Sequence, residues 1–147
     1  MTQVAEVIAL VTAAVNVAAG ALGAWRWWVV EPSPAFWVLC RAGQAVAVVQ
    51  AVVAGVLAAM GFDPDSNLYW LYAILPVAVS FVAEQLRITA AQAVLDARDL
   101  EDAQAVGDLP PDQQRSIVLS IVRREMGTMA AAAIVVAFLA ARAWGTA

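Results

Sequence analysis

The chain has 147 residues, of which 63% are hydrophobic and 14% are charged, and its formal net charge is -4 at pH 7. This composition argues against an ordinary water-soluble domain and predicts one integral membrane domain over residues 1–147. No basic patch favours nucleic acid as a partner. A chain without histidine and with a single cysteine has few ligands for haem, iron–sulfur clusters or zinc, so no cofactor or metal is expected.

Four segments are long and apolar enough to cross a membrane, because a hydrocarbon core of about 30 Å requires about 20 helical residues. They cover residues 4–25, 36–60, 68 to about 89, and about 125 to 144. The first contains the small-residue run AGALGA and so admits a second interpretation as a cleaved signal peptide. Its leader carries Glu6 in place of a positive charge and its apolar run is long, which favours a retained membrane helix.

The third and fourth helices are expected to continue beyond the bilayer. No helix breaker follows residue 89 until Gly107, and the prolines of GDLPP, followed by Asp112, are typical of a helix start. The predicted fold is therefore an all-α, antiparallel four-helix bundle in which helices 3 and 4 extend into a cytoplasmic helical hairpin. The predicted helices cover about residues 4–25, 36–60, 68–106 and 111–144.

The distribution of arginine predicts the orientation of the bundle. Arg26 and Arg41 flank the first connection, whereas the second carries Asp63 and Asp65 and no basic residue. The third connection is bracketed by further arginines: Arg87, Arg98, Arg115, Arg123 and Arg124. The positive-inside rule therefore places the first and third connections in the cytoplasm and both termini outside, with Arg142 as the exception. Because every basic residue is arginine and alanine and valine abound, we expect a bacterial cytoplasmic membrane.

Charged residues of three helices are predicted to lie at one depth near the cytoplasmic boundary. Counting about 1.5 Å per residue inward from the outer ends of helices 3 and 4 gives depths of about 24 to 30 Å for four of them. The predicted layer comprises Arg41, Glu84, Arg87, Arg124 and Glu125. We interpret it either as an interfacial ion-pair cluster that fixes helix register, or as a cation- or proton-linked site in which Glu84 changes partner between Arg41 and Arg124.

Other polar residues lie deeper in the predicted bilayer. Tyr72, Pro76 and Ser80 share one helical face with Glu84 on its outer side and are expected to line a polar path or to pack the bundle. Asn16, Gln44 and Gln50 are expected to form hydrogen bonds between helices. Helix 2 also carries small residues at four-residue spacing, which predicts a packing seam: Gly43, Ala47, Ala51, Gly55 and Ala59.

The run VVQAVVAGVLAAMGFDPDSNLYWLYAIL resembles the helix–loop–helix of the four-helix repeat of haem A synthase-like membrane proteins. Residues at comparable places are Gln50, Gly55, Pro64, Leu68, Leu71 and Tyr72. The position of the family's haem-ligand histidine is occupied here by Tyr69 or Trp70, so the resemblance does not extend to haem binding or to synthase activity. It covers about a quarter of the chain and implies a similar antiparallel four-helix arrangement in a haem-less relative.

Three functions are compatible with this pattern. The favoured one is a non-enzymatic integral membrane protein that acts by helix association in the lipid bilayer, as a homo-oligomer or as an accessory subunit of a membrane complex. The alternative is a small oligomeric transporter or channel, linked to ions or protons, that uses the Glu/Arg layer near the cytoplasmic interface. A third is a redox or lipid-handling enzyme, which the resemblance alone would suggest.

Overall fold

The computed structural model describes residues 1–147 and contains helices but no strands. The long helices are α1 (Thr2–Val29), α2 (Pro34–Ala59), α3 (Leu68–Asp96) and α5 (Pro111–Trp144), and the short helix α4 covers Ala103–Gly107. By length and composition, the four long helices could each cross a membrane. The prediction of an all-α chain with four long apolar helices is therefore confirmed.

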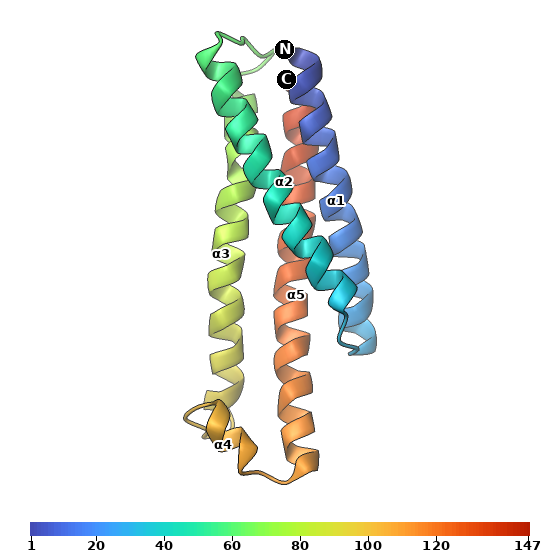
Figure 1. Cartoon of the computed structure of the whole chain (residues 1–147), viewed down its shortest axis with the longest axis vertical. Coiled ribbons are helices and arrows are strands. Elements are labelled where there is room, and N and C mark those ends of the chain that lie inside the picture. The colour runs from blue at the N-terminus through green and yellow to red at the C-terminus, as the bar shows by residue number, and fades with distance from the viewer.

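Consecutive long helices run in alternating directions along the long axis of the molecule (Figure 1). The connection between α2 and α3 lies near both termini, whereas α4 lies at the opposite end, between α3 and α5. The main packing partners of α5 are α1 and α3, while α2 packs on α1 and α3 and hardly touches α5. In Figure 1, α3 and α5 extend past the α1–α2 connection, so one end of the molecule is formed by α3, α4 and α5 alone.

The helix boundaries follow from local sequence signals. At the start of α2 the hydroxyl of Ser33 accepts a hydrogen bond from the Phe36 backbone N–H at 3.3 Å, and Pro34 occupies the first helical position. Pro111 likewise opens α5. The end of α1 is marked by Val30, whose φ of 55° is left-handed and cannot continue the helix. The left-handed cap at Val30 thus explains where the α1–α2 connection begins, and Pro111 explains where the connection before α5 ends.

The interior of the bundle is built largely from small residues and a few large ones. One buried cluster surrounds Phe62 and Tyr69 near the termini, and another surrounds Phe36, Met126 and Met129 further along the bundle. Helices approach closely where glycine faces a neighbour. A Cβ at Gly23 would lie 2.3 Å from the Phe36 ring, which no real contact allows. Small residues therefore set the spacing of the helices, as expected for helix packing in lipid.

The predicted single helix over residues 68–106 is wrong, because the structure divides it. α3 ends at Asp96, Asp99 adopts a left-handed φ of 54°, and α4 begins only at Ala103. The carboxylate of Asp102 caps α4 by accepting a hydrogen bond from the backbone at 3.0 Å. Aspartate supports both features, since its short side chain tolerates the left-handed region and caps helix starts. The acidic run therefore forms a turn and a helix cap in place of the predicted continuous helix.

Candidate functional site

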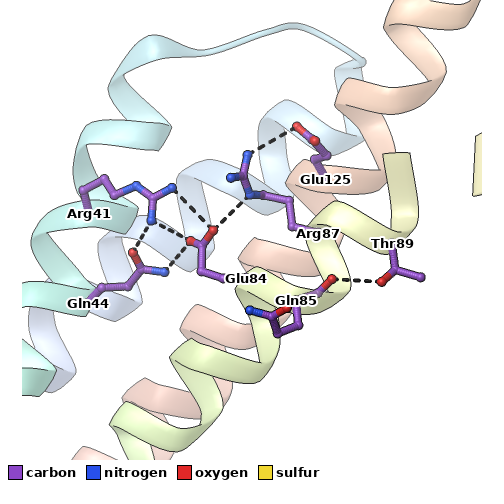
Figure 2. A network of polar contacts seen from close by, with 7 residues as sticks. All are labelled: Arg41, Gln44, Glu84, Gln85, Arg87, Thr89 and Glu125. Atoms are coloured by element: carbon purple, nitrogen blue, oxygen red, sulfur yellow. Dashed lines mark hydrogen bonds and ion pairs between the residues drawn. The ribbon is translucent and has the colours of Figure 1, made fainter. Parts of the chain in front are cut away.

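The main polar cluster joins α2 to α3 around the carboxylate of Glu84 (Figure 2). Arg41 Nη1 donates to Glu84 Oε1 at 2.6 Å, and Gln44 Nε2 donates to the same oxygen at 2.8 Å. Arg87 Nε donates to the other oxygen, Oε2, at 3.1 Å. Glu84 thus accepts hydrogen bonds from three side chains, two of them cationic.

The network continues from Glu84 in both directions. Arg41 Nη1 also donates to Gln44 Oε1 at 2.7 Å, which closes a triangle of side chains on the α2 side. On the other side, Arg87 Nη1 lies 3.9 Å from Glu125 Oε2, so the network reaches α5. The guanidinium of Arg87 is also 5.5 Å from the centre of the Trp37 ring, within the range of a cation–π contact. One connected set of side chains therefore links α2, α3 and α5 (Figure 2).

Helical spacing explains how the sequence builds this cluster. Arg41 and Gln44 are three residues apart on α2, and Glu84 and Arg87 are three apart on α3, so each pair shares one helix face. The side chains of Glu84, Arg87 and Glu125 are 23%, 27% and 19% exposed, whereas that of Arg41 is 54% exposed. The cluster is therefore half-buried at the edge of the bundle. Its two arginines balance its two glutamates.

The predicted charged layer is thus largely brought together, with one correction. Arg41, Glu84, Arg87 and Glu125 belong to the network, but Arg124 is exposed and forms no ion pair with any acid. The reason is helix geometry, because neighbouring residues are rotated by about 100° and so face different directions. The level of Arg124 along α5, next to Glu125, follows from the sequence, whereas the direction of its side chain does not.

The deeper polar residues find partners nearby. Asn16 is buried and its side-chain amide donates to the backbone oxygen of Thr12 at 2.9 Å and to that of Gly43, on α2, at 3.4 Å. Ser80 donates to the Pro76 backbone oxygen at 2.8 Å. Asn16 therefore forms a hydrogen bond between α1 and α2, whereas the hydrogen bond of Ser80 stays within α3.

The polar residues nearer the termini, Gln50 and Tyr72, have fewer hydrogen-bond partners. Gln50 is buried, and its Nε2 donates to the Ala73 backbone oxygen at 3.3 Å while its Oε1 has no partner. The Tyr72 ring lies 5.6 Å from the guanidinium of Arg142. Tyr72, Pro76 and Ser80 lie on α3 between its first residue and Glu84, but no hydrogen bond joins them into a continuous chain with Glu84.

A small cavity lies between the cluster and the deeper residues. Its volume is about 10 Å³, which is room for about one water molecule. Four of its lining residues carry polar or thiol groups: Asn16, Cys40, Gln44 and Ser80. Since Gln44 also binds Glu84, the cavity adjoins the carboxylate through a single side chain.

Sequence reasoning missed one buried polar group near the termini. Tyr69 is 1% exposed, its hydroxyl has no hydrogen-bond partner, and its ring packs edge-on against Phe62 and Trp70. An aromatic residue at the start of an apolar helix is equally typical of the boundary between lipid and water, where its hydroxyl would meet water. No sequence signal distinguishes the two situations, because both place an aromatic residue in the first turn of a helix.

These features define the class of protein as an all-helical bundle with four potential membrane-spanning helices and a half-buried Arg/Glu/Gln cluster. No group of three or more His, Cys, Asp or Glu side chains lies close enough to hold a metal ion. No protein-family model, no curated protein and no solved structure matches the chain. The resemblance to the haem A synthase-like repeat therefore stays a prediction.

Proposed function

We propose that the chain is a non-enzymatic, multi-pass protein of a bacterial cytoplasmic membrane that acts by helix association, as a homo-oligomer or as an accessory subunit of a membrane complex. The proposal begins from the distribution of apolar side chains. Large apolar groups such as Phe81 and Phe138 are 66% and 64% exposed, while alanines such as Ala9 and Ala140 are fully buried. This is the reverse of a water-soluble protein and suits a bundle solvated by lipid.

The proposed orientation places the α3–α4–α5 end in the cytoplasm and both termini outside, because the arginines gather toward that end. It is tested by introducing Asp65→Cys or Asp102→Cys into a chain in which Cys40 is replaced by serine. We expect a membrane-impermeant thiol reagent to label position 65 in intact cells and position 102 only after lysis. The reverse pattern would invert the proposed orientation.

Association is supported by one observation above the others, the outward face of α2. Val48, Val52, Gly55 and Val56 lie on one helical face and all are exposed. A Cβ added at Gly55 would meet no atom within 4 Å, so bare backbone is open to the surroundings at that point. In lipid, such a position allows the backbone of another helix to approach closely.

The test of association uses Gly55→Leu. Because Gly55 faces open space, leucine leaves the fold of one chain intact and even favours helix, but it obstructs close approach of a second helix. We expect energy transfer between labelled chains in liposomes, or recovery of a stoichiometric partner, to weaken by about tenfold. The matched control is Gly107→Leu, which also faces open space but lies in α4. Wild-type chains that stay monomeric and copurify with no partner would contradict the proposal.

The second candidate, an ion- or proton-linked transporter, is favoured by the small cavity that is lined by Gln44, a hydrogen-bond partner of Glu84. A single water in this cavity would connect Asn16 and Ser80 to Gln44 and, through it, to the carboxylate. Transport predicts a pH- or ion-dependent flux in reconstituted vesicles that is abolished by Glu84→Gln and largely retained by Glu125→Gln. An unchanged flux in the Glu84 variant would exclude this use of the cluster.

A further inference from the structure

A groove runs along the outer surface between α3 and α5. It has a volume of about 430 Å³, and eight of its nine lining residues are hydrophobic. Its α3 wall extends from Ala78 to Leu86 and its α5 wall from Thr128 to Val135, with Thr128 as the sole polar residue. The walls are formed largely by alanine and valine, so the groove is smooth as well as apolar.

The length of the groove indicates what kind of molecule fits it. From Ala78 to Leu86 the helix rises about 12 Å, which is close to the hydrocarbon depth of one leaflet, about half of the 30 Å core. A transmembrane helix of a second copy would need a contact surface along most of the core of about 30 Å, which is longer than this groove. The groove is therefore matched to an acyl chain from one leaflet.

A free positive charge stands at one end of this groove. Residues Thr128, Ala131, Ala132 and Val135 follow Arg124 by 4, 7, 8 and 11 positions, which places all of them on the helix face of Arg124. Thr128, which lines the groove, donates a hydrogen bond from Oγ1 to the Arg124 backbone oxygen at 3.0 Å, so Arg124 lies one helical turn beyond the end of the groove.

No acid neutralises this charge. Arg124 is exposed and forms no ion pair, whereas the nearby carboxylates of Glu84 and Glu125 face Arg87. The guanidinium of Arg124 is therefore available to an anion from outside the chain, at the end of the groove where a lipid head group would lie.

We infer that the groove between α3 and α5 binds one anionic phospholipid of the adjacent leaflet, with an acyl chain along Ala78–Leu86 and the phosphate on Arg124. The inference goes beyond the proposed function. It depends on the membrane placement of the bundle and is independent of whether the chain associates or transports.

The experiment is native mass spectrometry of the detergent-purified full chain titrated with phosphatidylglycerol or, for comparison, the zwitterionic phosphatidylcholine. We expect one phosphatidylglycerol per chain. Arg124→Gln should weaken its binding at least about fivefold. Arg123→Gln is the matched control, since Arg123 has the same depth but lies against Trp27, 5.2 Å from the ring centre. Ala131→Phe fills the groove at an exposed position and should weaken binding without altering the helical content.

Several results would overturn the inference. Equal losses in the Arg124 and Arg123 variants would mean general attraction of anions to the interface and no defined site. Equal retention of the two lipids would mean that the charge of Arg124 has no part in recognition. If Ala131→Phe leaves lipid binding unchanged, or converts a dimer into monomers while no lipid binds, the groove is not a lipid site.

Discussion

Replacement of Glu84 by glutamine removes the charge on which the α2–α3 network converges while keeping the shape of the side chain. The carboxylate accepts hydrogen bonds from Arg41 at 2.6 Å, Gln44 at 2.8 Å and Arg87 at 3.1 Å. Glutamine offers a single acceptor oxygen, so it can keep one or two of these contacts but no ion pair. Arg87 would retain Glu125, at 3.9 Å, as its only ion-pair partner, together with the Trp37 ring.

The magnitude follows from exposure. The Arg41 side chain is 54% exposed, so its ion pair is screened and contributes about 0.5 kcal/mol. The Arg87 pair is only about one quarter exposed, and a hydrogen bond between charged groups there contributes about 1 to 2 kcal/mol. Glu84→Gln should therefore lower the free energy of unfolding by about 2 kcal/mol, and Arg41→Gln by about 0.5 kcal/mol.

The assay is unfolding in mixed micelles, followed by circular dichroism as the fraction of denaturing detergent rises. Arg124→Gln serves as control and should change the free energy of unfolding by less than about 0.5 kcal/mol, because Arg124 has no ion pair. A double-mutant cycle between Glu84 and Arg87 should give a coupling energy of about 1 kcal/mol. The reasoning is refuted if Arg41→Gln costs as much as Glu84→Gln, or if Glu84→Gln costs no more than the control.

Three further predictions use the same unfolding assay. Gly23→Ala should cost about 1 to 3 kcal/mol, because its Cβ would overlap the Phe36 ring; an unchanged stability would show that the ring has room to move. Gln50→Leu should leave stability within about 1 kcal/mol or raise it, since Gln50 Oε1 is buried without a partner and the single bond to Ala73 is long. A loss above about 2 kcal/mol would mean that this oxygen is bonded after all. Asp99→Gly should raise stability by up to about 1 kcal/mol, because glycine adopts the left-handed φ of 54° without strain, and a decrease would assign the aspartate side chain a stabilising contact.

The long helices could be predicted because segments that are long and apolar enough to cross a membrane are recognisable from sequence alone. The start of α5 at Pro111 was predicted to the residue, since proline both terminates the preceding segment and favours the first helical position. The level of the charged residues along the helices could also be predicted, because the rise per residue of a helix is constant. That constancy explains why Arg41, Glu84, Arg87 and Glu125, from three helices, were expected at one level.

The direction in which a side chain points around the helix axis was harder to predict from the sequence than its level along the axis. Arg124 and Glu125 are adjacent in sequence, yet only Glu125 faces Arg87, and this depends on how α5 is rotated against α3. The rotation is set by the packing of many small side chains, and an alanine-rich helix offers several apolar faces of similar quality. The small residues of α2 show the same ambiguity, because Gly43 contacts Asn16 while Gly55 faces outward.

The end of α3 was missed for a different reason. The segment after Asp96 contains no proline or glycine before Gly107, and its alanine, leucine, arginine, glutamate and glutamine residues favour a helix. The structure instead uses Asp99 in a left-handed turn and Asp102 as a cap. Aspartate supports both outcomes, so the choice was made by tertiary packing, in which Leu95 and Ile117 are buried together.

The position of α5 in the bundle has a consequence for how the chain is made. α5 is the principal partner of both α1 and α3, yet it follows all the other helices in chain order. While the ribosome is still translating the α3–α5 connection, α1 and α3 are joined mainly through α2, and the faces of α1 and α3 that α5 will cover stay open to other nascent chains. The unfinished bundle is therefore exposed to mispairing until α5, residues 111–144, has also left the ribosome.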